Sequence, residues 1–94
     1  MFLGQVIGTV WATKKDSKLE GVKFQIVRRV DSDLNHEKDF VIAVDTVGAG
    51  AGEHVMVAQG SSARQTNLTK NKPVDAVIMA IVDDVDLHSK RKKK

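Results

Sequence analysis

Short stretches of alternating apolar residues, separated by polar or glycine-rich turns, run through most of the chain. This period of two is typical of β-strands, and it predicts strands over residues 3–13, 22–30, 40–46, 53–59 and 74–82. Between the last two strands, Ser62 and Gln65 have the spacing of a capping box. They predict one or two turns of helix that end near residue 68.

Four strands, a short helix and a final strand predict an all-β fold. Five or six short strands favour a small OB-like barrel, because closing the sheet removes exposed strand edges. A chain of 94 residues is expected to form one domain. We assign the barrel to residues 1–87 and a basic, disordered tail to residues 88–94.

The apolar positions also predict which side chains fill the core. In the second strand, Phe24 and Ile26 share the apolar face, whereas Gln25 points away. Phe40 begins the third strand on a regular apolar face, so we expect it in the core as well. Residues 31–39 read as a charged connection between these two strands.

The final strand is apolar on both faces, which a half-solvated strand of a small barrel is not expected to be. Its second apolar face consists of Val77, Met79 and Ile81. The predicted cover is another subunit, and the alternative cover is the short helix.

A glycine-rich loop joins the third and fourth strands, from Asp45 to Glu53. A phosphate-binding loop opens into a helix, whose N-terminal amides hold the anion. This loop opens into an apolar strand instead, so we interpret its small residues as a shaped turn and give Asp45 a structural role there. The small residues are Gly48, Ala49, Gly50 and Gly52.

Charge separates the body of the chain from its end. The formal net charge is +3, but the five cations in residues 90–94 leave the rest of the chain at −2. An acidic body repels a polyanion, and Trp11 is the one candidate platform for stacking a base. A module that binds single-stranded nucleic acid through Trp11 and the tail is therefore an alternative function, and our main expectation is no nucleic acid.

Several other classes of site lack a sequence signal. The chain has no cysteine, which excludes disulfides and thiolate metal sites. No histidine pair has metal-ligand spacing, no GxSxG elbow occurs, and no apolar segment is long enough to span a membrane. The N-terminus lacks the features of a signal peptide. An enzyme or small-molecule sensor would have to rely on Asp45 and Glu53 beside the glycine loop, and we expect no enzyme, no cofactor and no membrane partner.

Seven motifs, in order, resemble the EutN/CcmL family of pentameric vertex proteins from bacterial microcompartment shells. They are GQVIGTVWAT (4–13), LEG (19–21), AVDTVGAG (43–50), GEHV (52–55), GSSAR (60–64), PVDA (73–76) and IVD (81–83). Residues 31–39 and the lysine tail lie outside the pattern.

The resemblance implies a structural protein that forms a homopentamer and closes a vertex of a polyhedral shell around metabolic enzymes, in the bacterial cytoplasm. It implies hexameric shell proteins as neighbours, contacted through Gly60, Ser61, Ser62, Ala63 and Arg64. Arg64 then makes a forked contact to a neighbour or, alternatively, an ion pair within its own chain. The basic tail is a candidate contact for enclosed enzymes. The subunit interface or axial loop is expected to use Asp45, Gly48, Ala49, Gly50, Gly52, Glu53, Val77, Met79 and Ile81.

Overall fold

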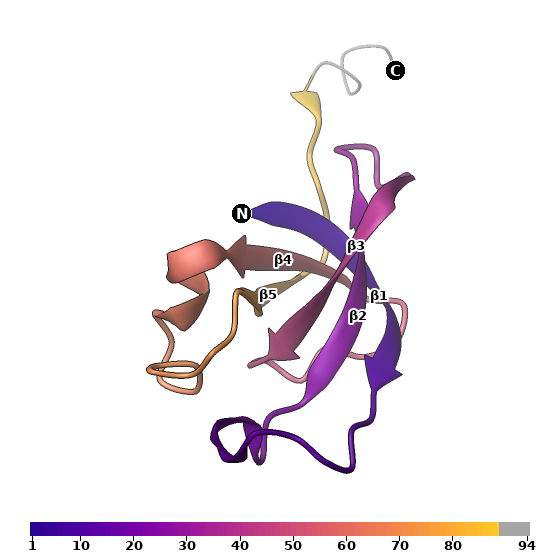
Figure 1. Ribbon diagram of the computed structural model, residues 1–94. Helices are drawn as coiled ribbons and strands as arrows, with labels where there is room; N and C mark the ends of the chain where they lie inside the picture. Colours follow the sequence, from indigo (N-terminus) through magenta and orange to yellow (C-terminus); the bar gives the residue numbers. More distant parts are fainter. Residues whose placement is uncertain (89–94) are drawn as a thin grey trace.

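Five strands close into one barrel in the computed structural model, which describes residues 1–88 (Figure 1). The strands run in the order β1-β2-β3-β5-β4 around the barrel, and β4 pairs with β1 to close it. The all-β barrel predicted from the sequence is confirmed, with two short 3-10 helices. The elements are β1 (Phe2–Val10), η1 (Ser17–Leu19), β2 (Phe24–Val30), β3 (His36–Asp45), β4 (His54–Gln59), η2 (Gly60–Arg64) and β5 (Ala76–Val82).

All strand pairs are antiparallel except β3 and β5, which run parallel and form the shortest pairing of the barrel. Their register joins Val44 to Val77 and Asp45 to Ile78. The Thr46 hydroxyl donates to the carbonyl oxygen of Ile78 at 2.7 Å and extends this seam by one side-chain bond. The seam therefore ends where the glycine loop begins.

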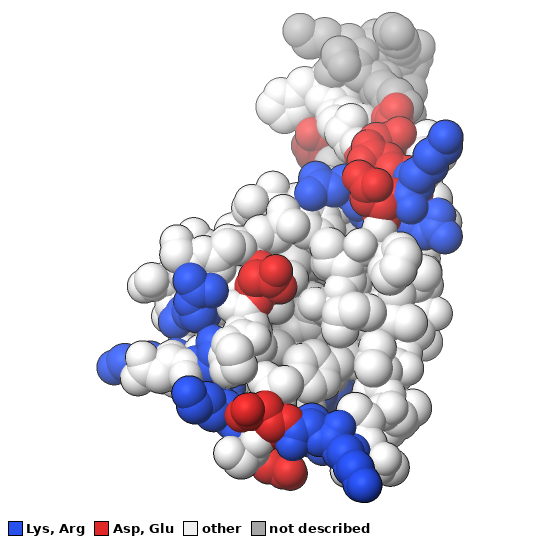
Figure 2. Space-filling view, viewed as in Figure 1, with Lys and Arg blue, Asp and Glu red and all other residues white. Residues whose placement is uncertain are grey.

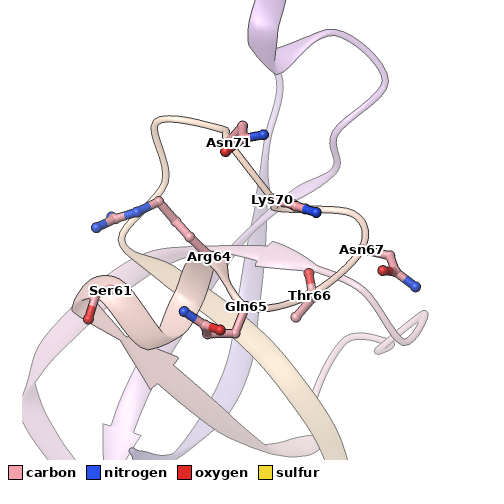
Figure 3. Close-up of a pocket in the computed structure, with 7 residues that line it drawn as sticks. All are labelled: Ser61, Arg64, Gln65, Thr66, Asn67, Lys70 and Asn71. Atoms are coloured by element: carbon pink, nitrogen blue, oxygen red, sulfur yellow. The ribbon is translucent and has the colours of Figure 1, made fainter.

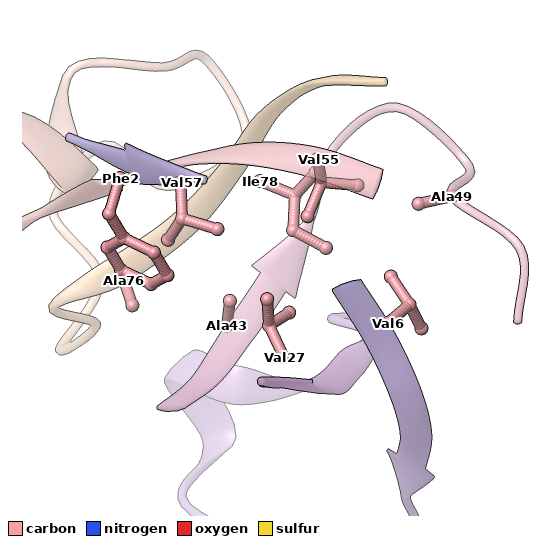
Figure 4. Close-up of a cluster of buried hydrophobic side chains, with 9 residues drawn as sticks. All are labelled: Phe2, Val6, Val27, Ala43, Ala49, Val55, Val57, Ala76 and Ile78. Carbon is pink, nitrogen blue, oxygen red and sulfur yellow. The ribbon is translucent and has the colours of Figure 1, made fainter. Parts of the chain in front are cut away.

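Mostly small side chains fill the interior of the barrel (Figure 4). A five-stranded barrel is narrow because barrel diameter grows with the number of strands, so valine and alanine suit its interior. Burying one valine side chain contributes about 1.5–3 kcal/mol. The main cluster is Phe2, Val6, Val27, Ala43, Ala49, Val55, Val57, Ala76 and Ile78.

A second apolar cluster lies between the barrel and η2. Ala63 of η2 is fully buried there against Val77 of β5, together with Val22, Val44, Ala58 and Val74. The side chain of Val77 is thus covered within its own chain, and the prediction that it lies in a subunit interface is wrong. The alternative prediction, that the short helix covers the second apolar face of the final strand, is confirmed for Val77.

β-bulges move other side chains between faces. In β5, Met56 pairs with Ala80 and Val57 with Ile78, so Met79 is the extra residue of a bulge. A bulge reverses the alternation beyond it. Ile81 consequently packs against the main core cluster, whereas Met79 stays 39% exposed. The prediction that Val77, Met79 and Ile81 share one outer face is therefore wrong.

The predicted face assignment of β2 is also reversed. Gln25 and Val27 point into the barrel and are buried, whereas Phe24 and Ile26 are only half-buried on its outer side. Phe40, which we expected in the core, is 59% exposed. Both faces of β2 carry apolar residues, so the alternation alone does not identify the inner one.

Two local predictions need correction. Strand β3 begins at His36, within the predicted connection 31–39, and not at residue 40. The turn before it is short because the Asp31 side chain accepts hydrogen bonds from the backbone amides of Asp33 and Asn35. The short helix starts at Gly60 rather than after Ser62, so Ser62 is no N-cap and the capping box is absent. It also ends at Arg64, four residues before the predicted end.

Gly4 provides a test of how tightly the barrel packs. A Cβ at this position would overlap Cγ1 of Val27 and lie 3.0 Å from the backbone oxygen of Arg28, so G4A is expected to destabilise the fold by about 1–3 kcal/mol. The matched control is G8A in the same strand, whose Cβ would lie 3.3 Å from Cδ1 at the flexible end of Ile26 and no closer than 3.8 Å to any other atom. Urea unfolding followed by circular dichroism measures both, and equal costs would contradict this account.

Candidate assembly surfaces

The Asp45 carboxylate organises the start of the glycine loop. Its Oδ1 accepts hydrogen bonds from the backbone amides of Val47 and Gly48, at 3.0 and 2.9 Å. Its Oδ2 accepts from the backbone amide of Ala49 at 2.9 Å. Asp45 is 7% exposed, so these bonds replace the water that a free carboxylate would need. The structural role predicted for Asp45 in this loop is confirmed.

A polar chain across the barrel end supports this carboxylate. Gln25 donates through Nε2 to Asp45 Oδ2 at 3.3 Å and to the carbonyl oxygen of Ala49 at 3.0 Å. The Thr9 hydroxyl donates to Gln25 Oε1 at 2.8 Å. Strands β1, β2 and β3 are therefore joined by side-chain bonds at the point where the loop leaves the barrel. Gln25 could not be identified from the sequence, because a glutamine in an alternating strand normally faces water.

The pKa of Asp45 lies below its ordinary value of 3.8. Burial alone raises this pKa, because it disfavours the charged form. The hydrogen bonds from Val47, Ala49, Gln25 and Gly48 favour the carboxylate and outweigh burial. Asp45 is therefore an ionised structural group at neutral pH, which is unlike a general base poised near pH 7.

The far end of the glycine loop is closed by Glu53. Its Oε1 accepts from the backbone amide of Gly50 at 2.6 Å, while its own amide donates to the carbonyl oxygen of Gly50. Gly48 and Gly52 have φ angles of 73° and 83°, a region that side chains disfavour. The loop is thus a fixed, hydrogen-bonded turn, in agreement with the interpretation from sequence.

The segment after η2 borders a polar hollow of about 540 Å³ (Figure 3). Arg64 and Lys70 line it, and among the described lining residues none is acidic. The other lining residues are Ser61, Gln65, Thr66, Asn67 and Asn71. Two cationic residues line this hollow without a carboxylate, which favours an anionic group from outside the chain. Lys70 was not among the predicted site residues, because nothing in its sequence context relates it to Arg64.

Arg64 is exposed, and Nη1 donates to the carbonyl oxygen of Val74 at 3.1 Å. This bond leaves the other guanidinium donors for a neighbour, and within residues 1–88 it takes the place of the ion pair considered above. Gly60, Ser61 and Ser62 are also exposed. Ala63 is fully buried, so its side chain holds η2 on the barrel and the prediction that it contacts a neighbour is wrong.

A buried threonine fixes the loop around this hollow. Thr69 is fully buried, and its hydroxyl donates to the carbonyl oxygen of Ala63 at 2.6 Å. Thr66 accepts from the backbone amide of Thr69 at 3.0 Å, and the two hydroxyls are hydrogen bonded. The segment that carries Arg64 and Lys70 is therefore fixed by hydrogen bonds between its own residues.

Large apolar side chains also lie on the outside of the barrel. Ile7, Phe40 and Ile42, on β1 and β3, are 47%, 59% and 42% exposed. Met56 and Met79, on β4 and β5, are 36% and 39% exposed. In the closed barrel, β1 and β3 flank β2, whereas β4 and β5 pair with each other on the opposite side. The two groups of exposed side chains therefore lie on different sides of the molecule. We name them the β1–β3 surface and the β4–β5 surface.

Charge is distributed unevenly over the barrel (Figure 2). Residues 11–23 and 60–74 contain seven lysines and arginines and two acidic residues. The remaining residues up to 88 contain three basic and ten acidic residues. We call the first group the basic end. The lysines at 90 and 92–94 and Arg91, assigned to the tail, lie outside the described residues.

Other kinds of site find little support in the described part of the chain. No group of three or more potential ligands is placed to hold a metal ion within residues 1–88. The same residues include no helix that is both long and apolar enough to cross a membrane. Asp45 and Glu53 belong to one loop, but each is engaged by backbone amides rather than by the other.

Replacing Asp45 by asparagine tests the loop network. An amide group would set a donor against the donors of Ala49 and Gln25, so D45N is expected to lower the free energy of unfolding by about 1–3 kcal/mol at pH 7. Because the pKa of Asp45 is lowered on folding, its contribution is present above pH 3.8 and is lost as the pH falls through the lowered pKa. The difference between the two proteins should therefore shrink below pH 3.8.

The matched control is E53Q, which keeps an oxygen acceptor for Gly50 in the same loop and should change stability by less than about 0.5 kcal/mol. Urea unfolding at fixed protein concentration measures all three proteins. The pH range from 2.5 to 7 includes about 1.3 pH units below the ordinary pKa of 3.8. A stability loss in D45N that stays constant over this range would contradict the role assigned to the charge.

Comparison with known proteins adds an independent result. A family model described as "Ethanolamine utilisation protein EutN/carboxysome" matches residues 1–83. The bacterial microcompartment shell vertex protein GrpN of Rhodospirillum rubrum (strain F11) is 45% identical over 86 residues, which cover 92% of this chain and 97% of that protein. The carboxysome shell vertex protein CcmL of Thermosynechococcus vestitus is 42% identical over 96 residues and is covered to 97%, as is this chain.

Solved structures agree with the sequence comparisons. The GrpN pentameric microcompartment shell protein from Rhodospirillum rubrum superposes with a TM-score of 0.85 at 45% identity, over 93% of this chain and 99% of that one. CcmL of Gloeobacter violaceus reaches a TM-score of 0.90 at 38% identity, over 94% and 91%. Sequence and fold thus match over nearly the full length of both relatives, and the chain belongs to the EutN/CcmL family.

Proposed function

We propose that this chain is a structural shell protein that forms a homopentamer at the vertices of a bacterial microcompartment, in the bacterial cytoplasm. The observation that carries the proposal is the nearly full-length match to GrpN, a pentameric shell protein, in both sequence and fold. Relatives with this match are named as shell vertex proteins, which favours a structural role over catalysis and over the binding of single-stranded nucleic acid.

The exposed apolar surfaces are consistent with a ring. The outer face of a solvated barrel strand is normally polar. Here the β1–β3 surface and the β4–β5 surface expose large apolar side chains on different sides of one molecule. A head-to-tail interface needs two different surfaces on each subunit, and it closes into a ring when the rotation is right. We assign these two surfaces to the subunit interface, with Met79 in the second.

The glycine loop is the second part of the proposed ring contact. Asp45 and Glu53 fix its two ends through backbone amides, so the loop keeps one shape without a partner. Its tip is short of side chains, and Gly48, Gly50 and Gly52 are exposed. Small exposed residues allow backbones to approach closely, as the axis of a five-fold ring requires.

The polar hollow beside η2 is the proposed contact to a neighbouring shell protein. Arg64 is anchored to Val74 and shares the hollow with Lys70, opposite no described acid. A guanidinium fixed in this way suits a carboxylate or a pair of carbonyl oxygens. We propose hexameric shell proteins as the neighbours, with Gly60, Ser61, Ser62 and Arg64 in the contact. The role of the lysine tail toward enclosed enzymes stays a prediction.

Native mass spectrometry tests the ring directly. Five chains of 10.3 kDa should give a species of about 52 kDa. The double variant F40S/I42S removes two apolar side chains from the β1–β3 surface and should shift the protein towards monomer, because apolar burial drives such contacts. The control E37S changes an exposed residue of the same strand and should leave the assembly intact. A monomeric wild-type protein would contradict the proposal.

Arg64 tests the contact between ring and shell. R64A should leave the pentamer intact and cost at most about 1 kcal/mol of stability, because Arg64 is exposed and loses one hydrogen bond to Val74. It should lower incorporation into reconstituted shells about tenfold or more. K38A, an exposed lysine on β3, serves as the control for loss of one positive charge. Incorporation of R64A at the level of K38A, measured by electrophoresis of purified shells, would remove Arg64 from the contact.

A further inference from the structure

A second hollow, of about 320 Å³, opens where β1 leaves the barrel. Trp11 forms one wall of it and is 86% exposed, the largest exposed fraction among the big apolar side chains. The stability of one chain gains little from a tryptophan in this position, because its apolar area stays in water. We name this feature the Trp11 hollow.

Apolar side chains line much of the Trp11 hollow, together with two lysines. Val10, Val22 and Phe24 face it with Trp11, and all three are buried or half-buried. The two lysines among its lining residues are Lys15 and Lys23, and none of the described lining residues is acidic. Lys15 donates to the carbonyl oxygen of Ala12 at 3.1 Å, which ties its ammonium group to the backbone of the residue after Trp11. The hollow thus combines an apolar interior with two positive charges.

The surface around the Trp11 hollow is also positively charged. Its lining residues between Trp11 and Lys23 belong to the basic end, where Lys14, Lys18 and Lys72 add to the two lysines of the hollow. Lys72 donates to the carbonyl oxygen of Lys18, so the two segments of the basic end are joined. A surface of this sign attracts acidic partners over roughly 10 Å at moderate salt.

From this combination we propose that the Trp11 hollow binds an acidic peptide segment of another protein. One large apolar side chain of the segment enters the hollow against Trp11 and Phe24. Carboxylates on either side of that residue pair with Lys15 and Lys23. A buried aromatic contact with charged pairs at its rim is the usual composition of a peptide-binding hot spot. This role goes beyond the vertex function and does not depend on how many subunits form the ring.

A peptide suits the hollow better than a nucleic acid does. Single-stranded nucleic acid needs a row of aromatic platforms along a basic groove, and Trp11 is the only tryptophan of a chain without tyrosine. The chain's own acidic segment, residues 83–88, leaves the barrel at the end away from residues 11–23 (Figure 1). It therefore does not reach the hollow of the same molecule, and a second copy is left as an outcome of the test.

The single tryptophan provides a direct measurement of binding. The full chain, in its native assembly, is titrated with the peptide acetyl-Asp-Glu-Phe-Asp-Glu-amide, which contains no tryptophan or tyrosine. Insertion of the phenylalanine beside Trp11 should shift the emission to shorter wavelength and saturate, with a dissociation constant below about 1 mM. The same peptide with glycine in place of phenylalanine, and a version with lysines in place of the acids, should bind at least about tenfold more weakly.

Variants locate the site when a fluorescein-labelled form of the peptide is followed by anisotropy. W11A should weaken binding about tenfold or more, and K15Q/K23Q about fivefold to tenfold with a reduced dependence on salt. K38Q, an exposed lysine on β3 outside the basic end, should bind like the wild type. Native mass spectrometry of W11A should give the same assembly as the wild type.

Four results would overturn the proposal. They are the absence of saturable binding, equal binding by W11A and the wild type, and tighter binding of oligo-dT than of the acidic peptide. The fourth is loss of the wild-type assembly in W11A, which would assign the hollow to the contact between copies of this chain. Since none of the binding measurements requires a pentamer, a wild-type protein that proves monomeric would contradict the vertex function and leave this test intact.

Discussion

The barrel and its glycine loop both depend on one buried carboxylate. Asp45 ends β3 at the short parallel seam with β5, and its oxygens accept four hydrogen bonds from the loop and from Gln25. An ionised group this deep is costly unless it is fully hydrogen bonded, and here it is held by three backbone amides and one side-chain amide. The shape of the loop follows from this requirement, because the amides of Val47, Gly48 and Ala49 must converge on one carboxylate.

The narrow interior of the barrel explains why several large apolar side chains lie on its surface. A barrel of five strands has room for valine and alanine but for few larger side chains, and several large apolar residues lie outside it. A protein that stayed monomeric would be expected to keep such residues few and scattered. The exposure of Phe40, Ile42 and Met79 is therefore consistent with the ring contact that we propose.

The same barrel presents chemically different surfaces for different contacts. Apolar strand faces suit a permanent ring, because apolar area is buried once and stays buried. The hollow beside Arg64 and Lys70 is polar and cationic, which suits a contact formed between finished building blocks. The Trp11 hollow combines both characters and suits a small acidic ligand segment. This division follows from the fold, since η2 and the 11–23 segment lie at the ends of the strands, away from the outer strand faces.

The sequence by itself determined the order of the elements, the closed all-β barrel and the interpretation of the glycine loop as a turn. These rest on local signals: alternation, turn residues, and a loop that opens into a strand rather than a helix. It also indicated a structural role for Asp45, but it did not identify Gln25 as its partner, because a glutamine in an alternating strand looks like a solvent-facing residue.

Only the tertiary structure decided which face of each strand is inside. Phe24 and Ile26 alternate as regularly as Gln25 and Val27, so the pattern of β2 fits either orientation. In the structure Gln25 and Val27 face the interior, where Gln25 donates a hydrogen bond to Asp45. In β5, the bulge at Met79 sends Ile81 inward, and η2 covers Val77. The position of a bulge and the packing of a helix on a strand depend on contacts between residues far apart in the sequence. The local alternation of apolar residues does not contain that information.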